Sequence, residues 1–301
     1  MCNKQENLAL ALGYFDGLHI GHQKVLSAAL EQQKQGLTPA VLLFDRHPAS
    51  VLTGRQVPRL LTDEDRDALL ASAGILPVKL RFADVKDLSP EAFVEEILCA
   101  RLSCAFVSCG FNYRFGRGGA GTAELLQTLC EAKGIGVSVS PQVTLRGEPV
   151  SSSAIRRAVA AGETEKAVAM LGRPLTFTAP VFSGDHRGRT LGTPTINQYL
   201  PEGFVTPAFG VYASITEVNG MRYPSVTNIG ARPTFGGGTV RSETYIIGFS
   251  GDLYGRTLRV ELLSFLRPEM KFASADALRE QISLDAQRAL KTVESSPYFQ
   301  K

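Results

Sequence analysis

Two of the four histidines in the chain lie three residues apart, in the stretch GYFDGLHIGHQK from Gly13 to Lys24. The glycines allow a tight backbone turn, and a helix that begins at Gly21 would direct its unpaired N–H groups into that turn. A helix N-terminus favours phosphate, and the imidazoles of His19 and His22 could donate to the same oxygens, especially where developing negative charge keeps them protonated. The stretch therefore predicts an anion site, although a pair of capping or core histidines has the same spacing.

A metal site is a third interpretation of these histidines. A metal ion would need further ligands, and the other histidines are His47 and His186, with no cysteine at metal-ligand spacing. We therefore expect phosphate rather than metal at this turn.

A second group of reactive side chains lies in GDHRGRTLGTPTIN, which runs from Gly184 to Asn197. Arginines, bare glycine backbone and small oxygen ligands crowd this one connection. The segment is typical of a site for phosphate and a divalent cation, and a basic turn would look the same.

Glu243 heads the strand-like run SETYIIGF and should share one face of the strand with Tyr245, Ile247 and Phe249. A carboxylate in an apolar or aromatic row indicates a functional site. A solvent-exposed edge strand is the alternative explanation.

Two glycine- and serine-rich segments are ambiguous. The run GRGGAGT, residues 116–122, could bind phosphate, but no lysine follows Gly121, so it is not a Walker A motif, and a flexible surface loop would also explain it. The run VSSSAIR, residues 150–156, is equally typical of a helix cap.

These residues must be positioned by two different kinds of architecture. From Leu8 to about Leu171, short apolar runs alternate with helical periods, the pattern of βα units on a mostly parallel sheet. Beyond Arg173 and Pro174, strand-like runs are separated by Gly, Pro and Asn, which favours a small antiparallel β-barrel. We therefore predict an α/β domain over residues 1–173 and a barrel over residues 174–301.

The expected elements follow from apolar periodicity and turn residues. The strands are LALALGYF, PAVLLF, VKLRF, AFVSCGF and GVSVS in the first domain, and GVYASITEV, YPSVTNIG, SETYIIGF and TLRVELLSFL in the second. The helices are HQKVLSAALEQQKQG, LTDEDRDALLASAG, EAFVEEILCARL after Ser89 and Pro90, TAELLQTLCEAKG, SSAIRRAVAAG, TEKAVAMLG and a closing helix ASADALREQISLDAQRALKTV.

Composition sets limits on partners and location. A net charge of +3 over 301 residues, with no Lys or Arg run, gives no basis for a nucleic-acid partner. No apolar segment reaches about 18 residues and no signal-peptide cleavage pattern is present, so we expect a cytoplasmic protein with no membrane partner. The cysteines form no CxxC pair and are expected to be buried, reduced thiols: Cys2, Cys99, Cys104, Cys109 and Cys130.

The motifs in both halves resemble those of one family. GYFDGLHIGHQ resembles the adenylyltransferase signature G-x-F-D-G-x-H-x-G-H-Q of bacterial bifunctional riboflavin kinase/FMN adenylyltransferases, or FAD synthetases. FDRHP, LSPEAFVEEIL, GFNYRFGRGGAG and VSSSAIR are similar to other motifs of that domain. GDHRGRTLGTPTIN resembles the riboflavin kinase signature G-x-x-R-G-R-x-L-G-F-P-T-x-N, and FGVYA, TNIGARPTF, SETYIIGF, DLYG and FLRPEMKF also match. The chain departs from the family pattern at Arg46, Ser153, Thr193 and Tyr245.

For residues 1–173 the resemblance implies a Rossmann-like nucleotidyltransferase domain. FMN would attack the α-phosphorus of ATP there, giving FAD and pyrophosphate, with His19 and His22 stabilising the phosphates. The other nucleotide- and phosphate-binding residues implied are Gly13, Phe15, Asp16, Gly17, Asn112, Ser152, Ser153 and Arg156.

For residues 174–301 the resemblance implies transfer of the γ-phosphate of ATP to riboflavin. Glu243 would orient and deprotonate the terminal ribityl hydroxyl, and Thr195 and Asn197 would hold Mg²⁺ with ATP. The remaining implied residues are Gly188 and Arg189 for the nucleotide and Arg267 for the flavin.

Two other functions would fit parts of this pattern. The first is an enzyme with one activity, if Tyr14, Arg46 or Thr193 marks a damaged site or if the first domain adenylylates another phosphate ester. The second is a non-catalytic flavin-binding protein, which would be expected to lose charged site residues. The chain keeps His19, His22, Arg156, Asn197 and Glu243, which argues against the second function.

Overall fold

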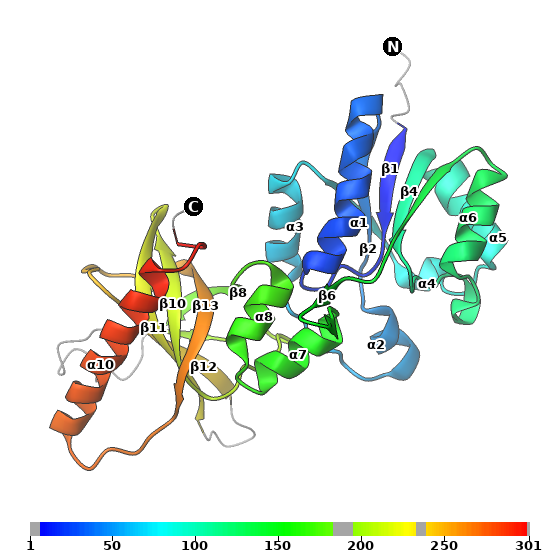
Figure 1. Ribbon diagram of the computed structural model, residues 1–301. Helices are drawn as coiled ribbons and strands as arrows, with labels where there is room; N and C mark the ends of the chain where they lie inside the picture. Colours follow the sequence, from blue (N-terminus) through cyan, green and yellow to red (C-terminus); the bar gives the residue numbers. More distant parts are fainter. Residues whose placement is uncertain (1–6, 183–194, 233–238, 300–301) are drawn as a thin grey trace. The chain divides into compact units, whose positions relative to one another are not determined.

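The computed structural model describes residues 7–182, 195–232 and 239–299, and the chain divides into two compact units (Figure 1). The first unit comprises Met1–Val57 and Asp63–Ser151. The second comprises Pro58–Thr62 and Ser152–Lys301, so the two helices that precede residue 174 belong to the same compact unit as the barrel.

The first unit is built on a five-stranded sheet in the order β3-β2-β1-β4-β5. All neighbouring strands are parallel, which confirms the α/β prediction. The order reverses between β1 and β4, and in open parallel sheets ligands generally bind at the carboxyl ends of the strands that flank such a reversal. The strands are β1 Leu8–Leu12, β2 Thr38–Phe44, β3 Leu76–Leu80, β4 Cys104–Gly110 and β5 Gly136–Ser140.

Two helices of the first unit begin at a capping hydroxyl. Ser89 accepts a hydrogen bond from the N–H of Ala92 at 3.1 Å, and Thr122 accepts one from Leu125 at 3.2 Å. The helices are α1 Ile20–Glu31, α2 Pro48–Thr53, α3 Asp63–Ser72, α4 Phe82–Val85, α5 Pro90–Ala92 continued by a π-helix Phe93–Arg101, and α6 Ala123–Glu131. Short 3₁₀ turns at Gln32–Gln35 and Arg117–Gly119 and a hairpin of β6 Thr144–Leu145 with β7 Glu148–Pro149 complete the unit.

The thiols lie in the core of the first unit, as expected. Cys104, Cys109 and Cys130 are buried and Cys99 is partly buried, all four unpaired, whereas Cys2 lies outside the described residues. Burial raises the pKa of Cys104 and Cys130 to about 12 and that of Cys109 to about 11. These cysteines are therefore unreactive packing residues.

The second unit contains a closed six-stranded barrel in the order β10-β11-β12-β9-β8-β13, in which every pair of neighbouring strands is antiparallel. The barrel prediction is confirmed. Its strands are β8 Leu175–Phe182, β9 Thr195–Tyr199, β10 Gly210–Val218, β11 Met221–Arg232, β12 Thr239–Ile246 and β13 Thr257–Pro268.

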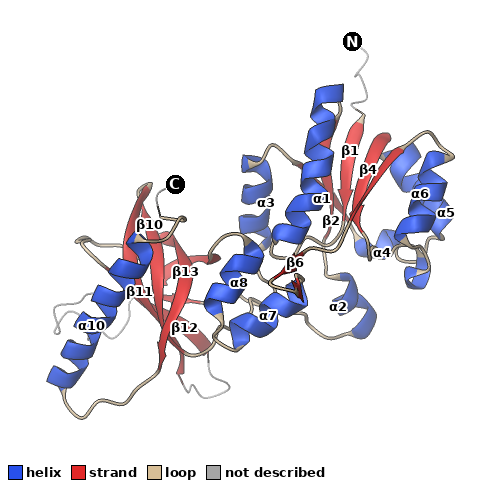
Figure 2. Cartoon of the chain, in the orientation of Figure 1, coloured by secondary structure: helices blue, strands red, loops and turns tan. Residues whose placement is uncertain are grey.

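Three helices accompany the barrel. α7 Ser152–Ala160 and α8 Thr164–Leu171 pack against each other, and α8 also contacts β8 and β13. α10 Ala275–Glu294 lies across the barrel and packs against β10, β11 and β13 (Figure 2). Ala289 and Val293 of α10 are fully buried, which confirms the predicted closing helix.

The environment of Glu243 differs from the sequence prediction in two ways. β12 pairs with both β11 and β9, so the edge-strand explanation is wrong. β12 ends at Ile246, and Gly248 then adopts φ +76°, so Phe249 leaves the strand and packs against Tyr223 in another cluster. The expected row on the face of Glu243 therefore does not extend to Phe249.

Candidate functional site

The turn between β1 and α1 holds an unusual backbone. Phe15 has φ +56° and Leu18 has φ +44°, left-handed values that side chains other than glycine rarely adopt, and Gly17 lies between them at φ +82°. Phe15 is fully buried, and a Cβ on Gly13 would lie 3.1 Å from its ring. Packing of Phe15 therefore stabilises the tight turn that the glycines allow.

His19 is the N-cap of α1. Its Nδ1 accepts a hydrogen bond from the backbone N–H of His22 at 3.2 Å, so in the neutral ring the proton resides on Nε2. A Cβ on Gly21 would lie 3.1 Å from the imidazole, so the ring needs glycine there. The capping interpretation is thus confirmed for His19, and it is compatible with anion binding because Nε2–H and the N–H groups of Ile20 and Gly21 have no intrahelical acceptor.

The two imidazoles of this turn stack on each other. Their ring centroids are 3.6 Å apart with an interplanar angle of 15°. Burial lowers the pKa of His19 to about 4, partly offset by its backbone hydrogen bond, and burial followed by the neighbouring His19 lowers the pKa of His22 well below its usual range. Both rings are therefore neutral near pH 7 in the protein alone, and in this state they could offer an anion hydrogen bonds but no positive charge.

A second aromatic contact involves Tyr14, one of the residues considered above as marks of a damaged site. Its ring centroid lies 4.0 Å from that of His47, and His47 Nδ1 accepts a hydrogen bond from the N–H of Ala49 at 3.0 Å, capping α2. Arg46 of the same FDRHP segment is exposed. Tyr14 is thus accommodated by packing on His47, in the segment between β2 and α2.

The glycine-rich segment after β4 is tied to its surroundings. Phe115 and Gly121 exchange backbone hydrogen bonds at 3.2 and 2.8 Å, and a Cβ on Gly121 would lie 2.5 Å from the Phe115 ring. The backbone N–H of Arg117 donates to the carbonyl of Leu88 at 2.7 Å. The segment is a defined turn, and the exposed Asn112 precedes it at the carboxyl end of β4.

The predicted adenylyltransferase residues of the first unit follow the two strands that flank the reversal in strand order. The residues after β1 are Gly13, Phe15, Asp16, Gly17, His19 and His22, and the residue after β4 is Asn112. Ser152 and Ser153 begin α7 in the second unit, where Arg156 Nε donates to the carbonyl oxygen of Pro58 at 2.6 Å.

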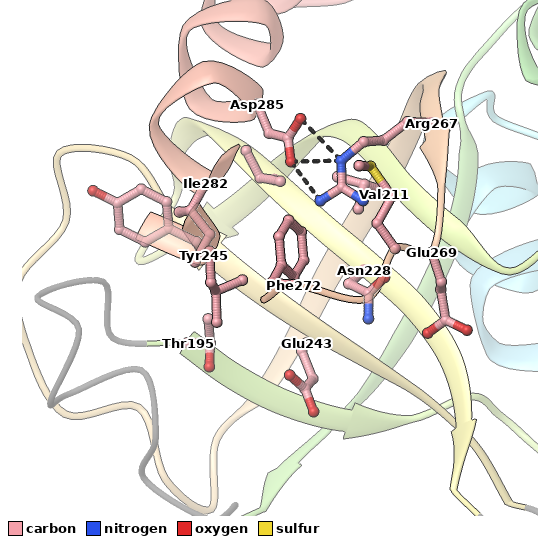
Figure 3. A pocket seen from close by; sticks show the side chains of 13 residues that line it. Thr195, Val211, Asn228, Glu243, Tyr245, Arg267, Glu269, Phe272, Ile282 and Asp285 are labelled. Carbon is pink, nitrogen blue, oxygen red and sulfur yellow. Dashed lines mark hydrogen bonds and ion pairs between the residues drawn. The ribbon is translucent and has the colours of Figure 1, made fainter. Parts of the chain in front are cut away.

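The second unit contains a cavity of about 280 Å³ between the barrel wall and α10. Figure 3 shows Thr195, Glu243, Asn228 and Glu269 toward one end and Arg267 with Asp285 toward the other. The rest of the lining is apolar or aromatic, formed by Val211, Val226, Tyr245, Met270, Phe272, Leu278 and Ile282. The cavity can therefore hold an elongated molecule with an aromatic body and a polar end.

Strand register brings the predicted polar residues together. Glu243 on β12 is paired with Asn197 on β9 and with Asn228 on β11, and Tyr245 is paired with Thr195. A hydroxyl, an amide oxygen and a carboxylate are the oxygen ligands that Mg²⁺ prefers, and Mg²⁺ commonly uses few protein ligands beside the phosphates. These residues fit a Mg²⁺ ion carried by ATP. Gly188, Arg189 and Thr193 lie outside the described residues.

A metal centre held only by protein side chains would be a different kind of site from one in which Mg²⁺ arrives with ATP. Within residues 7–182, 195–232 and 239–299, no group of three or more His, Cys, Asp or Glu side chains could hold a metal ion.

Arg267 and Asp285 form the polar far end of the cavity. Arg267 Nη2 and Nε lie 2.8 and 3.0 Å from Asp285 Oδ2, and the guanidinium carbon lies 5.8 Å from the centre of the Phe272 ring. The side chains are 13% and 2% exposed, so this is a buried ion pair that joins β13 to α10. Gln281 Nε2 also donates to Asp285, at 2.9 Å.

Sequence reasoning missed several residues of the cavity, namely Asn228, Glu269, Phe272 and Asp285. Asn228 and Glu269 lie within the runs TNIGARPTF and FLRPEMKF, but the pattern of those runs assigns them no role. Asp285 did carry a signal, because it is a carboxylate one position from the apolar face of the closing helix.

The chain matches two family models. One, described as FAD synthetase, matches residues 2–154, and the other, described as riboflavin kinase, matches residues 171–293. The bifunctional riboflavin kinase/FMN adenylyltransferase of Listeria monocytogenes is 38% identical, with 93% of this chain and 91% of that protein covered. Those of Bacillus subtilis, at 36% with coverage of 96% and 93%, and of Escherichia coli K12, at 35% with coverage of 93% and 91%, are also similar.

One similar solved structure is described as a macrolide-efflux protein from Streptococcus pneumoniae. Its TM-score is 0.87 at 30% identity, and the match covers 96% of this chain and 95% of that one. No helix in the described part of the present chain is both long and apolar enough to cross a membrane. The chain belongs to the bifunctional riboflavin kinase/FMN adenylyltransferase family, whose two ATP-dependent activities convert riboflavin to FMN and FMN to FAD.

Proposed function

We propose that residues 1–173 adenylylate FMN and that residues 174–301 phosphorylate riboflavin, with separate sites for the two reactions. The matches of the two family models, to residues 2–154 and 171–293, support this division. The observation that carries the kinase assignment is that Glu243, which is paired with Asn197 across β12 and β9, lines one polar end of a cavity whose wall is otherwise mainly apolar up to Arg267 and Asp285.

In the kinase reaction the isoalloxazine ring occupies the apolar middle of the cavity and the ribityl chain extends toward Glu243. Glu243 accepts the proton of the terminal hydroxyl, whose oxygen then attacks the γ-phosphorus of ATP. Thr195 and Asn197 would hold Mg²⁺, which neutralises phosphate charge when bound. Phosphoryl transfer depends mainly on alignment and charge, so Glu243 acts chiefly by orienting the hydroxyl.

In the adenylyltransferase reaction the start of α1 holds the phosphates of ATP. Nε2–H of His19 and the N–H groups of Ile20 and Gly21 donate to phosphate oxygens, and His22 donates from the ring stacked on His19. Donation strengthens as negative charge develops on the phosphate oxygens when the FMN phosphate attacks the α-phosphorus, the bond from that phosphorus to the bridging oxygen breaks and pyrophosphate leaves. Asn112 contacts the nucleotide from the turn after β4, and Ser152, Ser153 and Arg156 keep the phosphate-binding role implied by their motif.

The cytoplasm is the location we propose for this enzyme. The buried thiols of Cys104, Cys109 and Cys130 and the requirement for ATP support that location.

The test is a two-by-two set of initial rates. Protein with Mg²⁺ and ATP should convert riboflavin to FMN and added FMN to FAD, as followed by chromatography. His22→Ala should lower FAD formation by about 10²-fold or more and leave FMN formation unchanged, because it removes one preorganised donor. Glu243→Gln should lower FMN formation and leave adenylylation of added FMN unchanged.

Thermal melts serve as the control, because the His22 ring packs against those of His19 and Phe15 and its loss can also lower stability. If either variant lost both activities equally at an unchanged melting temperature, the two-site assignment would be wrong. Formation of FMN alone by the unmodified protein, even with FMN and excess ATP supplied, would also contradict it.

A further inference from the structure

Arg241 lies two residues before Glu243 on β12, so the strand's alternation places both side chains on the same face. The Nη2 atom of Arg241 forms an ion pair with Oε1 of Glu243. The side chains are 15% and 36% exposed, so the arginine is the more enclosed partner. The contact therefore fixes one oxygen of the carboxylate from the protein side.

The surroundings of Arg241 favour a role in the reaction. Its cross-strand neighbours are Tyr199 on β9 and Gly230 on β11. A Cβ on Gly230 would lie 2.5 Å from a carboxylate oxygen of Glu269, which also lines the cavity. The carboxylates of Glu243 and Glu269 thus both line the cavity into which the proposed reaction brings the triphosphate of ATP, and Arg241 supplies positive charge beside Glu243.

We propose that Arg241 is a positioning residue for riboflavin phosphorylation. It holds Oε1 of Glu243 and leaves Oε2 to accept the hydrogen of the ribityl hydroxyl. As the new bond from the hydroxyl oxygen to the γ-phosphorus forms, the bond from that phosphorus to the bridging oxygen breaks, ADP leaves, and the proton moves to Oε2. This inference rests on the proposed role of Glu243.

The ion pair also affects the electrostatics of ATP binding. A carboxylate next to a triphosphate would repel it, and a guanidinium already paired with the carboxylate reduces that repulsion while leaving the oxygen available. Partly exposed ion pairs contribute little to folding stability, so a large kinetic effect on removing Arg241 would reflect alignment rather than loss of fold.

The experiment is a double-mutant cycle with Arg241→Met, Glu243→Gln and the double variant in the full-length protein. Arg241→Met should lower kcat for FMN formation by about 10- to 100-fold, because misalignment of a reacting group has effects of this size. KM for riboflavin, adenylylation of added FMN and the melting temperature should change little. In the Glu243→Gln background, Arg241→Met should have almost no further effect.

Two further variants sharpen the result. Arg241→Lys keeps the charge and should recover part of the lost kcat. Arg222→Met is the matched control, because Arg222 forms an ion pair with Glu261 on the same barrel, with side chains 23% and 14% exposed, and neither is among the described residues that line the cavity. It should leave kcat for FMN formation unchanged.

The proposal would be overturned if Arg241→Met lowered kcat equally in the unmodified protein and in the Glu243→Gln variant, because Arg241 would then act independently of Glu243. An equal loss in Arg222→Met would also overturn it, since any broken barrel ion pair would then have the same effect. A full rate in Glu243→Gln alone would instead refute the proposed function of Glu243.

Discussion

At the scale of single residues, the structure assigns His19 two roles that are usually considered separately. One nitrogen caps α1 and the other remains a donor at the turn, because the cap fixes the neutral tautomer. The sequence predicted the turn and the helix start, since glycines and an apolar period follow each other there. It did not predict that the imidazoles are neutral, because desolvation depends on packing such as that of Phe15 and His22, whose rings lie 5.2 Å apart.

The depressed pKa of His19, about 4 in the folded protein, predicts a specific pH dependence of stability. Above the pKa of about 6.5 that His19 has in the unfolded chain, the ring is neutral in both states and the stability is at its full value. As pH falls from there toward 4, the unfolded chain takes up a proton that the folded protein does not, so the free energy of unfolding decreases. Between pH 7.5 and 4.5 this group should reduce the free energy of unfolding by roughly 2 to 3 kcal/mol.

The measurement compares chemical unfolding of the unmodified protein and His19→Asn at both pH values. Asparagine can cap the helix but does not titrate in this range, so the variant should lose less stability on acidification. Identical pH dependence in the two proteins would show that His19 has an ordinary pKa.

At the scale of elements, the sequence predicted the strands and helices well and the cavity only in part. Strands β10 to β13 and α10 follow from periodicity, whereas β8 and β9 were not predicted as strands. Glu243, Thr195, Asn197 and Arg267 lie in recognisable motifs. The cavity itself forms only when α10 closes over the barrel, which brings Asp285 to Arg267. Such a contact depends on the crossing of two elements, and local sequence pattern does not determine it.

The Arg267–Asp285 pair predicts how the cavity depends on α10. Asp285→Ala leaves a buried guanidinium without its carboxylate, and removal of one partner of a buried pair typically costs about 3 to 5 kcal/mol. Thermal melts should therefore show marked destabilisation, and KM for riboflavin should rise because α10 supplies Leu278 and Ile282 to the wall. Adenylylation of added FMN, measured below the melting transition, should persist.

The control is Arg267→Met with Asp285→Leu. Replacing both charges by apolar groups removes the unpaired charge and should recover much of the stability lost in Asp285→Ala. If Asp285→Ala melted like the unmodified protein, the pair would not be what holds α10.

At the scale of the whole molecule, the positions of the kinase residues and the packing of the barrel predict different N-terminal boundaries for a fragment that works as an independent kinase. All described kinase residues follow position 194, so a fragment of residues 174–301 should phosphorylate riboflavin. However, α7 and α8 belong to the compact unit of the barrel, Met170 and Leu171 are fully buried, and the N–H of Ala208 donates to the carbonyl of Val159 at 3.1 Å.

A fragment of residues 152–301 should therefore be the more stable kinase. Each large apolar side chain that becomes exposed without α7 and α8 costs about 1.5 to 3 kcal/mol, so residues 174–301 should melt at least about 10 °C lower than residues 152–301. Both fragments should make FMN at temperatures where they are folded, as judged by circular dichroism. Equal melting temperatures would show that α7 and α8 do not stabilise the barrel. A folded 152–301 fragment that made no FMN would instead refute the assignment of the kinase to this part of the chain.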